Sequence, residues 1–135
     1  MTVADAVAAI RQRLDAAWIA TTVAHEGRRH DPAADQAFLL CEVAPSPAAF
    51  ASIGAPDARI ARRPGAILVH VFVPLAEADP DGLARAHAVS VARLYEGTDF
   101  SGVACRAATV GSGARASDAY WRVTVTVPFV FDEII

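Results

Sequence analysis

Hydrophobic residues near the start of the chain recur every three or four positions, the spacing that places them on one face of a helix. They are Val3, Val7, Ile10, Leu14 and Trp18. Thr2 and Asp5 resemble a capping box, so this helix is expected to begin directly after Thr2. We interpret it as a helix packed on a sheet, because its polar face lacks the excess of basic residues that a membrane-surface helix needs.

A second segment with helical spacing follows residue 79. Asp79 or Asp81 is the expected N-cap, and Gly97 is expected to end the helix. Its inner face is predicted to consist of Leu83, His87, Val91, Leu94 and Tyr95. We therefore expect two helices, one at the start of the chain and one past its middle.

Five segments have the composition or the alternation of β-strands. They are residues 19–25, 38–43, 66–74, 103–110 and 119–133. The third is the predicted central strand, since apolar residues occupy both of its faces. The last strand alternates clearly, with its apolar face made of Trp121, Val123, Val125, Val127, Phe129 and Phe131.

Residues 48–65 are interpreted as a long connection, because glycine and proline interrupt them, and such loops are usually functional. The order is then a helix, two strands, this connection, a strand, a helix and two strands. It predicts an α+β fold, with a mostly antiparallel sheet of four to five strands and two helices packed on one face. At 135 residues we expect a single domain over residues 1–135.

The composition excludes several classes of protein. Hydrophobic residues make up 54% of the chain and charged residues 20%, which excludes intrinsic disorder. The net charge of −3 argues against a protein that binds nucleic acid through its overall field. Cys41 and Cys105 lie far apart without a CxxC spacing, which fits a reducing compartment in which each is a small buried side chain.

The sequence also lacks the patterns of membrane insertion and export. No run of about 18 uncharged apolar residues occurs. The first residues, MTVADAV, contain no basic segment followed by an apolar one. We therefore expect a protein without a membrane partner that is assembled in the cytoplasm.

Few residues are candidates for chemistry. His25 and His30 flank two arginines in a polar loop, and a metal site there is the less favoured interpretation, because arginines repel a cation and the spacing is not that of zinc ligands. His70 and His87 are interpreted as hydrogen-bonded core residues rather than as a catalytic pair. The segment GSGAR precedes a strand, so we interpret it as a hairpin turn and not as a phosphate loop. No catalytic residue, cofactor or metal site is assigned.

The arginines are more informative. Arg59, Arg62 and Arg63 lie near the end of the long connection, and Arg28 and Arg29 adjoin in an earlier loop. The chain contains no lysine, so its basic contacts use planar guanidinium groups, which suit carboxylates and phosphates. Two interpretations have equal weight: solvated loops, or an interface with other subunits or a partner protein.

Several segments in a fixed order carry a resemblance to a known family. They are W-x-x-T-x-V-A at Trp18, IG before a basic loop, RRPGAILVHVFVP, a helix that ends in LYEG, and the terminal VTVTVPFVFDE. Each is an ordinary pattern alone, but their order and spacing together resemble the phage tail terminator-like family of long-tailed phages and gene transfer agents. The resemblance runs from Trp18 to Glu133.

The resemblance implies a structural protein and not an enzyme. Members of this family form a ring, usually a hexamer, that ends the growth of the tail tube and joins the tail to the head-side stopper protein. The expected partners are further copies of this chain, the tail tube protein and the stopper, with DNA passing through the lumen without specific binding and with no cofactor. The expected location is the head–tail junction of a particle assembled in the bacterial cytoplasm.

A closed ring requires two different surfaces on each subunit, and the candidates are residues 44–65 and the exposed strand edges. Two other functions stay open. The chain could be another neck component, a stopper or a head–tail adaptor. In a different class, it could be a small α+β enzyme or ligand-binding domain that uses the loop from His25 to His30.

Overall fold

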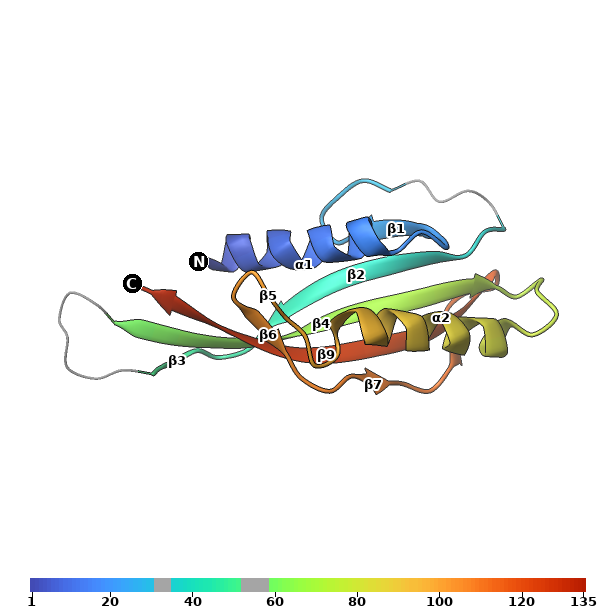
Figure 1. Cartoon of the computed structure of the whole chain (residues 1–135). Coiled ribbons are helices and arrows are strands. Elements are labelled where there is room, and N and C mark those ends of the chain that lie inside the picture. The colour runs from blue at the N-terminus through green and yellow to red at the C-terminus, as the bar shows by residue number, and fades with distance from the viewer. Residues whose placement is uncertain (31–34, 52–58) are drawn as a thin grey trace.

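The chain folds into two helices and a large mixed sheet (Figure 1). The computed structural model describes residues 1–30, 35–51 and 59–135. The elements in chain order are α1 (Val3–Ala17), β1 (Thr22–His25), β2 (Phe38–Pro45), β3 (Ala49–Phe50), β4 (Ile60–Pro74), α2 (Pro80–Tyr95), β5 (Asp99–Phe100), β6 (Val103–Cys105), β7 (Thr109–Val110), β8 (Ala114–Arg115) and β9 (Tyr120–Ile134).

The sheet is larger than the sequence predicts, and it is mixed. Its main path is β1-β2-β4-β9-β6-β5, with β3 beside β4 and with β7 and β8 beside β9. Four of the nine strands have two residues each, which is too short for any periodicity to reveal them. β1 and β2 are parallel, and residues 26–37 between them are as long as a parallel crossover needs, about a dozen residues. The expected, mostly antiparallel sheet of four to five strands is therefore wrong in size, and the parallel pair of β1 and β2 makes the sheet mixed.

The longest feature is the antiparallel ladder of β4 and β9, each 15 residues long. It runs from Ile60 opposite Ile134 to Pro74 opposite Tyr120. Residues 66–74 are central, as predicted, between β2 and β9. The expected connection 48–65 is wrong where the structure describes it, since β3 and residues 60–65 of β4 are strands. Pairing with β9 overrides the polar and proline-containing local sequence there.

The predicted strand 103–110 is divided into β6 and β7. Residues 106–108 lie outside both strands, although the Arg106 N–H still donates to the Pro128 carbonyl of β9 at 2.8 Å. The backbone N–H of Ala108 donates instead to the Glu96 carboxylate, at 3.0 Å. This side chain therefore replaces a strand partner that sequence periodicity cannot anticipate.

Both helices begin as predicted. At α1 the Thr2 hydroxyl accepts from the Asp5 backbone N–H at 3.2 Å, and the Asp5 carboxylate accepts from the Thr2 N–H at 2.8 Å, which completes the capping box. At α2 the Asp79 carboxylate accepts from the Gly82 N–H at 3.1 Å, so Asp79 is the N-cap. Gly97 follows the helix with a φ of +67°, the left-handed conformation that favours glycine.

Both helices pack on one face of the sheet, as expected, and share one core with it. The Tyr95 hydroxyl of α2 donates to the Ile10 carbonyl of α1 at 2.7 Å and so joins the two helices. The inner face of α2 is richer in alanine than predicted, since Ala84, Ala88 and Ala92 are buried there while His87 is half-buried. On α1, Val3 is exposed. None of the helices in the described ranges is long and apolar enough to cross a membrane.

The other face of the sheet carries half-buried side chains. Phe38 stacks on Phe72 with ring centroids 4.8 Å apart, and Tyr120 meets Phe38 edge-on at 5.3 Å. Aromatic pairs of this geometry are favourable, so the rings partly shield one another without a covering helix.

Candidate assembly surface

One end of the sheet extends beyond the N-terminus of α1 as an arm (Figure 1). We define the arm as residues 49–51, 59–65 and 129–135, which comprise β3 and the ends of β4 and β9 that pair there. The backbone N–H of Ile135 donates to the Arg59 carbonyl at 2.9 Å, so the pairing continues to the last residue. The arm therefore brings part of the expected 44–65 surface and the end of the terminal strand together.

Two ion pairs link the strands of the arm. Arg62 contacts both carboxylate oxygens of Asp132, at 2.9 Å and 3.1 Å, and Arg63 pairs with Glu133. The hydrogen bond and charge of Arg62 lower the pKa of Asp132, while the same pair raises the pKa of Arg62. Both arginines, predicted as partner-binding residues, thus already have carboxylate partners within the chain, and they stabilise the arm.

The tip of the arm exposes large hydrophobic side chains. Phe50 is 59% exposed and Ile134 is 74% exposed. The guanidinium carbon of Arg59, the third predicted arginine of this cluster, lies 5.6 Å from the centre of the Phe50 ring. Exposed apolar side chains next to a cation, for which the described residues provide no carboxylate partner, form a surface suited to association with another protein.

A groove of about 540 Å³ runs along one side of the arm. Residues 46–51 form one wall, and Arg106 and residues 128–130 form the other. Gly65 lies at its base, where a Cβ atom would stand 2.5 Å from the Phe129 ring and 2.9 Å from the Ala44 carbonyl oxygen. Arg62 and Arg106 both line this groove, so its polar rim is basic.

The other two predicted arginines lie elsewhere. Arg28 is in the segment after β1 and lines a shallow hollow beside α1 together with Arg11 and Asp15. Arg29 follows it in the chain. The structure thus brings Arg59, Arg62 and Arg63 together on the arm but does not join Arg28 to them.

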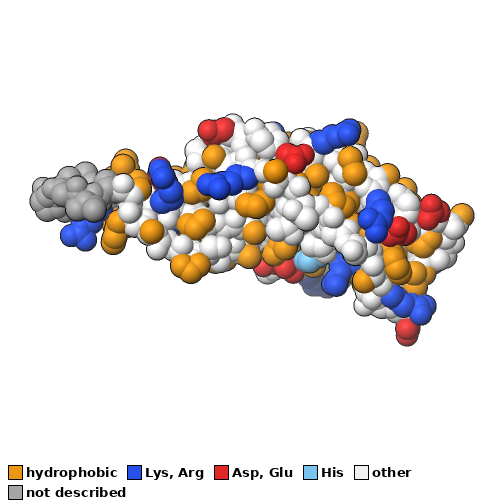
Figure 2. All heavy atoms as spheres, turned by 90° about the horizontal axis from the view of Figure 1, so that it is seen from below, with side chains coloured by type: hydrophobic (Ala, Val, Ile, Leu, Met, Phe, Trp, Pro, Cys, Tyr) orange, Lys and Arg blue, Asp and Glu red, His pale blue; other side chains and the backbone are white. Residues whose placement is uncertain are grey.

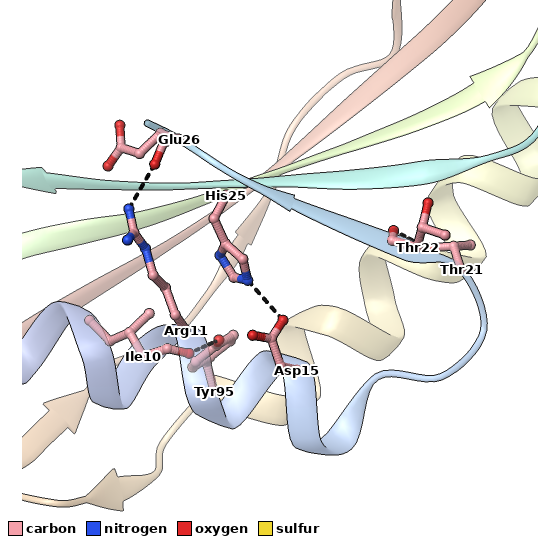
Figure 3. A network of polar contacts seen from close by, with 8 residues as sticks. All are labelled: Ile10, Arg11, Asp15, Thr21, Thr22, His25, Glu26 and Tyr95. Carbon is pink, nitrogen blue, oxygen red and sulfur yellow. Dashed lines mark hydrogen bonds and ion pairs between the residues drawn. The ribbon is translucent and has the colours of Figure 1, made fainter. Parts of the chain in front are cut away.

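His25 is the buried last residue of β1, which confirms the end of the predicted strand 19–25 and corrects its description as the first residue of the polar loop (Figure 3). Its Nε2 atom lies 2.8 Å from an Asp15 carboxylate oxygen on α1. Beside it, Arg11 donates to the Glu26 carbonyl at 2.9 Å. These contacts hold β1 against α1, which assigns His25 a structural role.

His30 contacts Phe38 instead of joining His25. Within residues 1–30, 35–51 and 59–135, no three histidine, cysteine or acidic side chains form a group that could hold a metal ion. His70 is hydrogen-bonded, to Thr124 at 2.8 Å, but it is half-buried on the face opposite the helices. His87 meets the edge of Trp18. Neither histidine lies in the main core. The expectation of core residues is therefore wrong for both, while the expected hydrogen bond is confirmed for His70.

The cysteines are free and buried, as predicted. Burial raises the pKa of Cys41 to about 12 and also raises that of Cys105. Cys41 is opposite His25 in the ladder of β1 and β2, yet the Nδ1 atom of His25 has no hydrogen-bond partner among the described residues. A nucleophilic thiolate requires a lowered pKa or a base that is hydrogen-bonded to the thiol. The pKa of Cys41 is raised instead, and His25 makes no hydrogen bond to its thiol among the described residues.

Sequence reasoning missed Arg106, Asp132 and Glu133 as members of this surface, and it included Phe50 only within the expected surface 44–65. Phe50 had a usable signal, because it is a large hydrophobic residue in a segment interpreted as a loop. No sequence signal could have identified Arg106, because it reaches the groove only through the pairing of β6 with β9.

The structure defines an α+β protein with a mixed sheet, two helices on one face and a projecting arm. No family model and no curated protein matches the chain. A solved structure whose name does not describe a function is similar to it, with a TM-score of 0.70 and 21% sequence identity over 97% of this chain and 96% of the other. At this identity the similarity establishes the fold alone.

Proposed function

We propose that this chain is a structural protein of the phage tail terminator type. In this role, copies form a ring, expected to be a hexamer, that caps the tail tube and ends its polymerisation. The ring then joins the tail to the head-side stopper protein. The proposal combines the resemblance from Trp18 to Glu133 with a surface suited to association.

The arm is the observation that supports an assembly role most strongly. It extends a sheet beyond its helices and exposes Phe50, Ile134 and Ile135 to solvent. Contiguous apolar side chains on a projecting element are typical of protein interaction sites. The net charge of −3 suits a ring around passing DNA, since a basic lumen would bind phosphate.

The test is to mix the purified chain with tail tube protein from the same particle and to image the mixture by negative-stain electron microscopy. We expect a ring at one end of each tube and shorter tubes as the amount of this chain increases. Tubes that keep their length and have no added density at their ends would refute the proposal. Binding to the head-side connector without any effect on tubes would instead indicate the stopper or adaptor function.

A variant of the arm provides a control within the same experiment. Phe50→Ser removes an exposed ring without changing the charge or the buried core. We expect this variant to fold normally and to cap tubes poorly. Val89→Ser, at a hydrophobic residue 41% exposed on α2, is the matched control and is expected to cap them normally.

A further inference from the structure

The end of the molecule opposite the arm (Figure 1) contains a group of acidic residues. We define the acidic end as residues 75–81 and 116–119, two turns joined by the hydrogen bond from the Leu75 N–H to the Ala119 carbonyl at 2.9 Å. It contains four acidic residues and no basic one: Glu77, Asp79, Asp81 and Asp118. Asp81 is paired with Arg85, and Arg115 precedes the second turn, whereas Glu77 and Asp118 are exposed without a side-chain partner among the described residues.

The arm has the opposite balance. The described arm residues and the groove wall contain four arginines and two acidic residues: Arg59, Arg62, Arg63, Arg106, Asp132 and Glu133. Because Arg62 and Arg63 have carboxylate partners, the positive charges without a carboxylate partner among the described arm and groove residues are Arg59 and Arg106. On the face shown in Figure 2, basic side chains are spread over both halves of the molecule, whereas acidic side chains appear mainly over the half away from the arm.

These two charged surfaces cannot neutralise each other within one chain. The ladder of β4 and β9 separates Arg59 from the acidic end, and its 15 residues of strand span roughly 50 Å. Arg106 lies nearer, beside Pro128 of β9, which is roughly 26 Å of strand away from Tyr120. At both distances solvent and salt screen the attraction between exposed charges. Their complementarity is therefore useful only between two molecules.

We infer that the groove of the arm receives the acidic end of a second copy of this chain. Arg59 and Arg106 then face Glu77 and Asp118 of the next copy, and Phe50 lies against the small side chains of its turns. Those are the exposed residues Ala76, Ala78, Ala116 and Ala119. Contact of two arms or of two acidic ends would place like charges together, which is unfavourable.

This contact is heterologous, since one end of each copy meets the other end of its neighbour, and repetition of such a contact closes a ring or extends a filament. The biological role of this contact rests on the proposed function, because the contact would join neighbouring subunits of the ring. Its geometry rests only on the groove and on the charges of the two surfaces.

Exchanging the charges tests the contact directly. The arm variant is Arg59→Glu with Arg106→Glu, which leaves the ion pairs of Arg62 and Arg63 intact. The acidic-end variant is Glu77→Arg with Asp118→Arg. The matched control, Arg28→Glu with Arg93→Glu, makes the same charge change as the arm variant at exposed residues outside both surfaces.

Association is measured by analytical ultracentrifugation and native mass spectrometry, with circular dichroism to confirm that each variant is folded. Each end variant alone is expected to weaken self-association at least about tenfold, because like charges then face each other. An equimolar mixture of the two variants is expected to restore association, since each altered end then meets a complementary one. The control is expected to associate like the unaltered chain.

The failures of the two proposals are distinguishable. Oligomers that form equally well in every variant, or a mixture that does not restore them, would overturn the inferred contact and leave tube capping intact. Oligomers that follow the charge exchange but leave tube growth unchanged would overturn the proposed function and support the contact. A chain that stays monomeric both alone and with tube protein would overturn both.

Discussion

At the scale of single residues, Tyr95 shows how a polar atom in the core is accommodated. Its side chain is fully buried, and its hydroxyl donates to the Ile10 carbonyl on the other helix. Burial raises the pKa of this phenol, so the group stays neutral and remains a hydrogen-bond donor. The contact thus fixes the position of α2 against α1 without placing a charge in the core.

Removing this hydroxyl tests its contribution. Tyr95→Phe is expected to lower the free energy of unfolding by about 1 kcal/mol, the net value of a typical hydrogen bond. Urea denaturation followed by circular dichroism measures the change. Tyr120→Phe is the control, because the Tyr120 hydroxyl bonds to the Gln36 carbonyl at an exposed site. An equal loss in both variants would contradict a special role for the buried contact.

His87 predicts a pH effect with a definite sign. Burial lowers its pKa below the ordinary value of 6.5, so near pH 6 the unfolded chain binds more protons than the folded one. Its contribution to stability is therefore retained above pH 6.5 and is lost as the pH falls through the folded pKa. We expect melting temperatures measured from pH 7.5 to pH 5 to fall less steeply in His87→Gln than in the unaltered chain. Parallel curves would show that His87 does not contribute.

The sequence predicts residues well where one local rule determines them. The caps formed by Thr2 and Asp79 depend on neighbours three residues away, and both were predicted. The partners of Arg62 and Arg63 lie 70 residues away, so only the register of the paired strands reveals them. The contact between His25 and Asp15 similarly forms only when β1 packs against α1, so no spacing along the chain predicts it.

At the scale of elements, length decides what could be predicted. The helices and the long strands contain enough residues to show a period, and the sequence locates each of them. Three of the two-residue strands form because β4 or β9 offers them a backbone partner, and β5 pairs with β6. The candidate site was the hardest part to predict, because it consists of β3 and of the ends of β4 and β9, which only long-range pairing reveals.

The arm is expected to depend on its ion pairs. Arg62→Glu with Arg63→Glu places four acidic side chains together, so residues 60–65 and 130–134 should exchange their amide hydrogens at least about tenfold faster. Residues 67–73 should be unaffected, since this part of β4 lies between β2 and β9 and every second side chain is buried under the helices. Hydrogen exchange with mass spectrometry measures both regions, and we also expect this variant to lose tube capping.

The variant Arg62→Asp with Asp132→Arg is the matched control, because it exchanges the two charges of one ion pair and leaves the pair of Arg63 unchanged. Slow amide exchange in the arm should be retained in this variant. Unchanged exchange in the charge-reversal variant would mean that backbone pairing alone maintains the arm and that the ion pairs are dispensable.

At the scale of the whole molecule, one core unites all the long elements. Trp18 follows α1, while Trp121 lies on β9 and donates to Asp81 at the start of α2. Both side chains pack in or against the same hydrophobic cluster. We therefore expect the chain to unfold as one cooperative unit, as small single domains usually do.

Two single-tryptophan variants test this cooperativity. In Trp18→Phe the fluorescence reports on β9, and in Trp121→Phe it reports on the end of α1. In each variant the urea midpoint from fluorescence should coincide with the midpoint from circular dichroism. Two separate midpoints within one variant would show that the helical layer and the sheet unfold independently.

The close contact at Gly65 determines the alignment of the two longest strands. Gly65 is opposite Phe129, and the ring occupies the space that any larger residue would fill. Shifting β4 by one position along β9 would place Pro64 or Ala66 opposite that ring, which then meets a side chain instead of a bare backbone. Gly65 therefore favours one register of the two strands, because only a residue without a Cβ atom leaves space for the Phe129 ring.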